Sequence, residues 1–154
     1  MTVNGKTRSK FNVEKDTSKR TYNGIVFDSV LEMKFYRDVI CPNMESGNIK
    51  SCEMQVKYEL QPKYKHDGKT VLPINYVADF VVVDKDDNLT VIDTKGMPDS
   101  VAKIKRKMFW YIYPEIKYVW ITYVKKYGGW VEYDETKKKR NEEKRLKKKS
   151  EKKV

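Results

Sequence analysis

The sequence has few of the residues that most often carry metal or nucleophilic chemistry, with two cysteines and one histidine among 154 residues. Cys41 and Cys52 are too few, and too far from a histidine, to form a zinc site, and we expect them to remain thiols in a reducing compartment. His66 stands beside Asp67 and Gly68, where we expect it to be a turn residue. These scarcities exclude most histidine-based catalytic mechanisms.

Long apolar stretches are also missing. The first ten residues, MTVNGKTRSK, contain no apolar run that could act as a signal peptide. No window of the sequence approaches the ~20 consecutive apolar residues that a membrane span needs. We therefore expect an intracellular, cytoplasmic protein that has no membrane partner.

Charge, by contrast, is abundant and unevenly distributed: the chain carries 33 Lys or Arg against 22 Asp or Glu. Residues 137–154 hold eleven of these bases and only three Glu, so most of the net charge of +11 lies in this tail. Because its only apolar residues are one Leu and one Val, we expect a frayed helix or disorder there. The tail is either a solubilising extension or, as we favour, an arm that binds a polyanion such as nucleic acid.

The length of the chain predicts one domain with a single hydrophobic core. We expect residues 1–20 to be a loose basic segment, residues 21–136 to form the domain, and residues 137–154 to be the basic tail. Hydrophobic periodicity, capping residues and turn signals predict the order helix, three antiparallel strands, helix, strand, which is typical of an α/β fold with helices flanking one mixed central sheet. The first expected elements are a turn at Asn23-Gly24 and a helix over 27–40, which is capped by Ser29 or Asp28 and ended by Pro42. Three strands are expected over 52–65, 72–84 and 89–96, joined by turns at Asp67-Gly68 and 84–88. A helix over 98–114, capped by Asp99 or Ser100, a strand over 116–124 and an edge strand over 128–133 complete the expected domain.

The second expected helix is amphipathic, with an apolar face against the sheet and a basic face toward solvent or phosphate groups. An ordinary amphipathic helix is enough to explain this pattern, whether or not its lysines also contact DNA. The residues expected to point inward are Val101, Ile104, Met108 and Ile112, and the basic residues expected to point outward are Lys103, Arg106 and Lys107.

The segment VIDTKG, residues 91–96, places Asp93 and Lys95 two residues apart on one face of an apolar strand. An acid followed two residues later by lysine occurs seven times in the chain, so the spacing alone carries little information. An exposed ion pair, usually worth less than ~1 kcal/mol, explains the other six pairs well. Only the position of this pair in the sheet can give it another role.

The expected hairpin supplies that position. If the acidic turn over 84–88 closes in either of two registers, opposed residue numbers sum to 172 or 173, and Asp79 lies opposite Asp93 or Thr94. Opposed α-carbons are about 4.5–5.5 Å apart, and Lys95 lies about 7 Å along the same face. Two carboxylates in otherwise apolar strands repel each other unless one is protonated or a cation lies between them. Oxygen ligands of this kind suit Mg²⁺ or Mn²⁺.

The segments NGIVFDSVLEMKFY, LQPKY, YVADF and DTKG, in this order, resemble the PD-(D/E)xK nuclease superfamily, and more narrowly the small phage-encoded nucleases that include Holliday-junction resolvases. The resemblance covers about residues 20–124. It implies a restriction-endonuclease-like core with an acid, Asp79, in the second strand and the triplet Asp93-Thr94-Lys95 in the third. There are two departures from the pattern: an Asp stands at position 93 in place of the more usual Glu, and Ala78 replaces the proline of the motif.

The resemblance also implies a third acid on the first helix, and Glu32 is at the matching position. Ser29-x-x-Glu32 is equally a capping box, in which the Glu side chain would return to the Ser29 amide. Gln61, in LQPKY, could touch the site, although an ordinary strand residue is the more common role. The implied metal ligands for Mg²⁺, with Mn²⁺ as a substitute, are Asp79, Asp93, the Thr94 carbonyl and Glu32, and the implied catalytic residues are Glu32, Asp79, Asp93 and Lys95.

These features predict a Mg²⁺-dependent endonuclease that hydrolyses phosphodiester bonds of branched DNA. The resemblance implies Holliday-junction resolution in phage recombination or replication, within the host cytoplasm, by a homodimer with one site per subunit. A general or flap-type endonuclease would use the same site, whereas a non-catalytic nucleic-acid-binding protein, or a basic adaptor for an acidic partner, would not need it. The residues expected to bind DNA are Lys103, Arg106, Lys107, Lys137, Lys138, Lys139 and Arg140.

Overall fold

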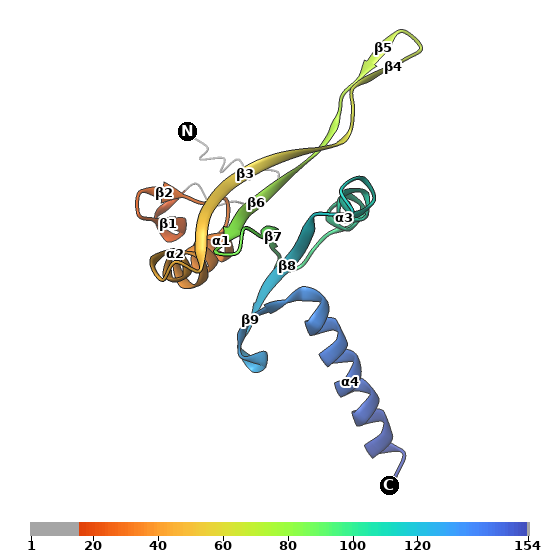
Figure 1. Cartoon of the computed structure of the whole chain (residues 1–154). Helices are drawn as coiled ribbons and strands as arrows, with labels where there is room; N and C mark the ends of the chain where they lie inside the picture. The colour runs from red at the N-terminus through yellow and green to blue at the C-terminus, as the bar shows by residue number, and fades with distance from the viewer. Residues whose placement is uncertain (1–15, 154) are drawn as a thin grey trace, which may run out of the picture.

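A five-stranded sheet, in the order β3-β6-β7-β8-β9, forms the centre of the computed structural model, which describes residues 16–153 (Figure 1). Most of the expected loose segment over 1–20 therefore lies outside the described residues. Strands β3, β6 and β7 are antiparallel neighbours, β8 runs parallel to β7, and β9 is antiparallel to β8. The predicted α/β fold with a mixed central sheet and helices is confirmed. The strands are β3 (Ile49–Gln61), β6 (Ile74–Asp84), β7 (Leu89–Thr94), β8 (Lys117–Val124) and β9 (Gly129–Glu132).

Helices pack on both faces of the sheet, because each face carries its own cluster of buried apolar side chains. The elements that precede β3 cover one face, and the helix between β7 and β8 covers the other. The predicted turn at Asn23-Gly24 is present between the first two strands, and both residues have a positive φ. The elements are η1 (Ser18–Arg20), β1 (Thr21–Tyr22), β2 (Ile25–Val26), α1 (Val30–Phe35), the π-helical η2 (Tyr36–Ile40), α2 (Cys41–Glu45), α3 (Ser100–Ile112) and η3 (Lys125–Tyr127).

The first helical segment is longer than predicted. Ser29 is its N-cap, as expected, and accepts a hydrogen bond from the Glu32 amide. Pro42, however, does not end it: the chain widens into a π-helical stretch and Pro42 then lies in the first turn of α2, which continues to Glu45. Because proline lacks an N–H but fits the first turn of a helix, the π stretch lets the helix pass this residue.

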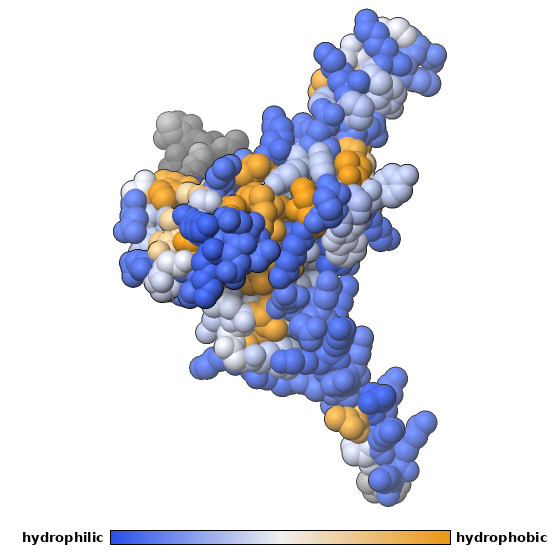
Figure 2. Space-filling model, in the orientation of Figure 1, coloured by the Kyte–Doolittle hydropathy of each residue, from blue (hydrophilic) through white to orange (hydrophobic). Residues whose placement is uncertain are grey.

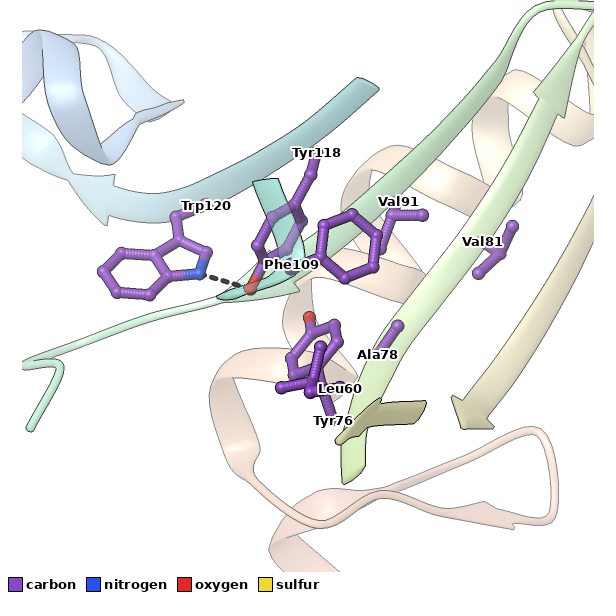
Figure 3. Close-up of a cluster of buried hydrophobic side chains, with 8 residues drawn as sticks. All are labelled: Leu60, Tyr76, Ala78, Val81, Val91, Phe109, Tyr118 and Trp120. Carbon is purple, nitrogen blue, oxygen red and sulfur yellow. Dashed lines mark hydrogen bonds between the residues drawn. The ribbon is translucent and has the colours of Figure 1, made fainter. Parts of the chain in front are cut away.

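Side chains on β6 and β7 alternate between the two apolar clusters, as a strand with both faces covered requires. Val81 and Val91 face α3, in the cluster shown in Figure 3, whereas Phe80 and Ile92 face α1. The alternation breaks at Asp79: Ala78 lies in the α3 cluster and Phe80 in the α1 cluster. Strand β6 therefore twists at Asp79, which lies between the two clusters.

Helix α3 begins at the predicted cap, because the Asp99 carboxylate accepts a hydrogen bond from the Ala102 amide at 2.8 Å. Its predicted inward face is wrong for three of the four residues. Val101 and Ile104 are 56% and 58% exposed, whereas Phe109 is fully buried. A buried Phe removes more apolar area from water than Val or Ile, so Phe109 sets the phase of the helix, and Trp110 and Tyr111 remain exposed.

Of the other two residues predicted to point inward, Met108 does so, because it is half-buried and packs against the cluster that contains Phe109, whereas Ile112 is 39% exposed. Arg106, predicted to point outward, has a side chain that is only 13% exposed. Its guanidinium lies 3.9 Å from the Trp120 ring centre and 4.6 Å from that of Trp110, and it pairs with Asp134 at 3.2 Å. This arginine therefore has a packing role.

Two segments project from the body of the molecule (Figure 1). One is the hairpin arm, in which β3 and β6 extend to a tip formed by β4 (Tyr64–His66), the predicted Asp67-Gly68 turn and β5 (Lys69–Val71). The other is α4 (Tyr133–Glu151), a single helix that contains most of the basic tail, so disorder was the wrong alternative there. Both segments are mostly hydrophilic (Figure 2). No helix among residues 16–153 combines the length and apolar character needed to cross a membrane.

Candidate functional site

The backbone of the site is the end of the β6–β7 ladder. Phe80 pairs with Ile92 and Val83 with Leu89, so opposed residue numbers sum to 172 and Asp79 faces Asp93. The shorter of the two predicted turn closures, through Asn88, is confirmed by the Asp84 N–H, which donates to the Asn88 carbonyl.

Beyond the pair Phe80 and Ile92, where the backbone pairing of β6 and β7 ends, side chains form the hydrogen bonds between the two strands. The Asp79 N–H donates to Asp93 Oδ1 at 3.3 Å, and both the N–H and the hydroxyl of Thr94 donate to Asp79 Oδ2, at 2.8 and 3.0 Å. Thr94 thus donates two hydrogen bonds to Asp79, whereas the sequence resemblance assigned its carbonyl to a metal ion. The two acids are held in fixed positions by the strands that carry them.

Lys95 completes the triplet. Its ammonium lies 2.6 Å from Asp93 Oδ2, in a pair whose side chains are 24% and 3% exposed. The Lys95 N–H donates to the Ile121 carbonyl at 2.8 Å, so the parallel contact between β7 and β8 holds the backbone of this lysine. The same ammonium lies 5.6 Å from the centre of the Trp120 ring. Because Asp93 is buried, this pair is not an exposed surface ion pair of the kind proposed for the other six acid and lysine pairs.

The two aspartates do not both hold a negative charge easily. Burial, followed by the neighbouring charges of Asp93 and Glu32, raises the pKa of Asp79 to about 8, although the Thr94 amide acts in the opposite direction. Desolvation disfavours a carboxylate, and so does a second carboxylate nearby. A cation between the acids would relieve both effects.

Glu32 lies at this site from the α1 side and is 7% exposed. Burial is the largest cause that raises its pKa to about 7, and the charges of Asp28 and Asp93 raise it further. Its Oε1 accepts a hydrogen bond from the Ser29 hydroxyl at 3.2 Å, so the side chain returns to the hydroxyl of Ser29, whereas the predicted capping box would use the amide. Helix capping and proximity to the acids therefore coexist in one residue.

Gln55 is a site residue that the sequence reasoning missed. Its Nε2 donates to Glu32 Oε2 at 3.4 Å, and its φ of 55° is unusual for a residue other than glycine. The pairing of β3 with β6 places it opposite Asp79, between Met54 and Val56. Only the register across the long hairpin arm identifies this residue, and the sequence did not determine that register.

Gln61, the glutamine that the sequence reasoning proposed, lies at the base of the arm. It pairs with Ile74, five residues before Asp79 along β6, which corresponds to roughly 17 Å of strand. The structure therefore does not bring Gln61 to the acids.

A pocket of about 330 Å³ opens beside the acids, between the sheet and α3. Asp79, Asp93 and Lys95 line one side, and Val101 and Lys105 are among the residues that line the other. The sequence reasoning did not single out Lys105. It lies on the same helix as the three basic residues that were proposed to bind DNA, one turn beyond Val101.

Those proposed DNA-binding residues have different surroundings. Lys103 and Lys107 are exposed on α3, whereas Arg106 is packed as described above. On α4, the Lys137 ammonium lies 5.1 Å from the Tyr133 ring centre, Lys139 lies 5.1 Å from that of Tyr127, and Lys138 pairs with Glu135 at 3.4 Å. Arg140 is exposed on the same helix. These α4 side chains lie on a projecting helix and not in the pocket.

The donors of the site fit a hard divalent cation that keeps some of its own waters. Within residues 16–153, no set of three His, Cys, Asp or Glu side chains forms a ready-made metal cluster. Two facing carboxylates are available, and Mg²⁺ commonly binds one or two carboxylates, with waters and substrate phosphate as the other ligands. The pair Asp79 and Asp93 satisfies that smaller requirement, and Glu32 adds a third acid nearby.

A family model described as "Protein of unknown function (DUF1064)" matches residues 8–129. The chain belongs to this DUF1064 family. The matched range contains all the acids of the site, Lys95, Lys105 and Gln55, and it ends before α4. The basic helix therefore lies outside the matched range. No curated protein matches the chain.

Proposed function

We propose that this protein is a Mg²⁺-dependent endonuclease that hydrolyses phosphodiester bonds of DNA, with branched DNA such as a Holliday junction as its substrate. The observation that carries the proposal is the facing pair Asp79 and Asp93, with Lys95 bound to Asp93 at 2.6 Å. Burial and the nearby negative charges raise the pKa of Asp79 to about 8, so a cation bound between the two acids would stabilise their charged forms. An acid pair with an adjacent lysine suits metal-assisted hydrolysis of a phosphate ester.

Each residue of the site has a distinct role in this mechanism. Asp79 and Asp93 would hold one Mg²⁺, with the Thr94 carbonyl as the third protein ligand that the sequence resemblance implies. When bound, the ion would lower the pKa of a water and polarise the scissile phosphate. Lys95 provides a positive charge beside the acids and can stabilise negative charge that develops on the phosphate oxygens. Glu32, with a pKa of about 7, can hold a proton next to the same centre.

The shape and charge of the molecule support DNA as the substrate. The exposed basic helix α4 and the exposed lysines of α3 supply positive charge outside the pocket, and contacts between such residues and phosphate strengthen binding through counterion release. Resolution of a four-way junction requires a nick in each of two strands, so we propose that the active form is a homodimer with one site per subunit.

The test compares cleavage of a labelled four-way junction and a matched linear duplex by three proteins, in Mg²⁺ or in chelator. These are the wild type, Asp93→Asn and the control Asp86→Asn, which alters an exposed acid in the turn at the other end of β6 and β7. We expect the wild type and the control to cut the junction in Mg²⁺ alone and Asp93→Asn to be inactive. Cleavage by Asp93→Asn, or no cleavage of any DNA by the wild type, would contradict the proposal.

The same experiment separates the alternatives. Cleavage of linear duplex or flap DNA in preference to the junction would indicate a general or flap-type endonuclease. A non-catalytic nucleic-acid-binding protein, for which the basic helix α4 is the supporting observation, would bind DNA equally well with and without the Asp93→Asn substitution and would need no Mg²⁺.

A further inference from the structure

The four basic residues of α3 differ in what they contact. Lys103 and Lys107 are exposed, and Arg106 is held between two tryptophan rings and Asp134. Lys105 is half-buried and lines the pocket that contains Asp79 and Asp93. Of the bases on this helix, Lys105 is the one in the pocket.

Lys105 has no electrostatic partner there. Within residues 16–153, its ammonium forms no hydrogen bond and no ion pair. The other ammonium in the pocket, that of Lys95, is already bound to Asp93 at 2.6 Å. A half-buried ammonium loses part of its hydration, and an anion in the pocket would compensate for that loss by accepting a charge-assisted hydrogen bond.

The pocket has room for such an anion. Its volume of about 330 Å³ is at the lower end of the range for ligand sites. Apolar side chains, including Val101 and Trp120, form part of its wall, so a charge in the pocket is partly screened from water. Lys105 lies across from the two acids, where a strand that enters between the sheet and α3 would place its phosphates.

We propose that Lys105 is a substrate-binding residue that holds a phosphate of the DNA strand next to the acid pair. This inference rests on the proposed function, because it names a further contact of the same site. It assigns Lys105 a role different from that of Lys95: Lys95 pairs with Asp93 and provides positive charge for the reacting phosphate, whereas Lys105 fixes the position of the strand.

The experiment measures DNA binding and cleavage separately for the wild type, Lys105→Gln, Lys105→Arg and Lys85→Gln. Lys85 is an exposed lysine in the turn between β6 and β7 and is the matched control for loss of one charge. Binding of a labelled junction is followed by fluorescence anisotropy in chelator at several salt concentrations, and cleavage is followed in Mg²⁺ at saturating and limiting protein.

We expect Lys105→Gln to bind the junction about 10- to 100-fold more weakly than the wild type, as loss of one charge-assisted contact predicts. Its log–log salt slope should be smaller by about 0.9, the value for one phosphate contact. Lys105→Arg should restore most of the affinity, and Lys85→Gln should bind as the wild type does. Added inorganic phosphate should compete weakly, since free phosphate shares the chemistry but lacks the rest of the strand.

The results distinguish failure of this inference from failure of the proposed function. If the wild type cuts DNA but Lys105→Gln binds and cuts like Lys85→Gln, the inference alone is wrong. If the wild type binds DNA without cutting it, the nuclease proposal is wrong, and the affinity and salt slope of Lys105→Gln still decide the role of Lys105. A loss of thermal stability in Lys105→Gln with an unchanged salt slope would mean that Lys105 only neutralises the acids. Absence of any DNA binding would refute both proposals.

Discussion

Strands β6 and β7 carry acids at both of their ends, and the two ends behave in opposite ways. At the turn, the half-buried Asp84 accepts hydrogen bonds from the amides of Asn88 and Asp86, which lower its pKa. At the other end, burial and like charge raise the pKa of Asp79 to about 8. Acids of the same type on the same pair of strands therefore serve as a turn cap at one end and as a candidate reactive group at the other.

The comparison shows that the number of acids in a segment says little about chemistry. The turn over 84–88 contains three aspartates, but water and backbone amides stabilise their charges. At the site end, Asp79 accepts hydrogen bonds from Thr94 and Asp93 pairs with Lys95, but burial and the neighbouring carboxylates still raise the pKa of Asp79. A cation or a proton is needed only there.

The largest expected effect is the difference in cleavage rate between a variant that lacks an acid at the site end and a variant that lacks an acid at the turn. Asp79→Asn should lower the cleavage rate of a four-way junction at least ~100-fold, because one of the two carboxylates proposed to hold Mg²⁺ is lost. Asp86→Asn should change the rate less than about twofold. Single-turnover cleavage with both variants measures this difference, and equal rates would show that the site end has no catalytic role.

A second difference concerns stabilisation by Mg²⁺. A ligand that binds only the folded state raises stability by RT ln(1 + [L]/Kd), which is about 2.7 kcal/mol at 100 Kd. We expect Mg²⁺ to raise the melting temperature of the wild type and of Asp86→Asn by a few degrees, and to leave that of Asp93→Asn nearly unchanged. Thermal melts in Mg²⁺ and in chelator test this expectation. A rise of the same size in Asp93→Asn would mean that the ion binds elsewhere.

A third difference is the direction in which the contribution of each acid to folding stability changes with pH, measured in the presence of chelator. Asp79 has a pKa raised from 3.8 to about 8, so the folded state holds its proton more tightly than the unfolded state. Its contribution to stability is complete below about pH 4 and is lost as the pH rises toward 8. Asp84 has a lowered pKa, so its contribution is present above about pH 4 and is lost in acid.

Urea unfolding between pH 3 and pH 8 separates these two contributions. Asp79→Asn should remove part of the loss of stability between pH 5 and pH 8. Asp84→Asn should leave that part of the curve unchanged and should flatten the acid limb. If Asp79→Asn has the same pH dependence as the wild type, the Asp79 carboxyl is ionised in the folded protein and the asymmetry between the ends is smaller than described.

Much of this site could be predicted from the sequence because the hairpin between β6 and β7 is local. A short acidic turn allowed only two registers, and both brought Asp79 beside the triplet that begins at Asp93. Gln55 could not be found in the same way, since its register with β6 depends on the hairpin arm with its separate tip strands. The residues of the short turn determine the register between β6 and β7, but they do not determine the register between β3 and β6.

Helix α3 shows a second limit of the sequence. Its residues fit more than one inward face, and the periodicity of Val101 and Ile104 favoured the wrong one. Phe109 decides the true phase because its ring is fully buried in the cluster that Tyr118 shares. Because the observed inward face differs from the predicted one, Arg106 packs against other side chains and Lys105 lies in the pocket. A count of apolar residues along the helix could not indicate these two positions.

The smallest predicted effect concerns two tyrosines beside the site end (Figure 3). The Tyr118 hydroxyl accepts a hydrogen bond from Trp120 Nε1 at 2.7 Å. The buried Tyr76 hydroxyl has no partner of suitable geometry within the described residues, although it lies near enough to Tyr118 to influence its pKa. Burial, together with the charge of Asp93, raises the pKa of Tyr76 far above its usual value, so this hydroxyl stays neutral.

Phenylalanine substitutions distinguish the two hydroxyls, because each removes a single oxygen and keeps the ring. Tyr118→Phe should lower the free energy of unfolding by about 1–2 kcal/mol, since it leaves the buried Trp120 N–H without an acceptor. Tyr76→Phe should not lower it and should raise it by up to about 1 kcal/mol, since a buried hydroxyl without a partner has lost its hydrogen bonds to water and gained none. Urea unfolding at one pH measures both values. Equal destabilisation by the two variants would show that the Tyr76 hydroxyl forms a hydrogen bond in the folded protein and that the polar groups at the site end are more completely paired than the acids indicate.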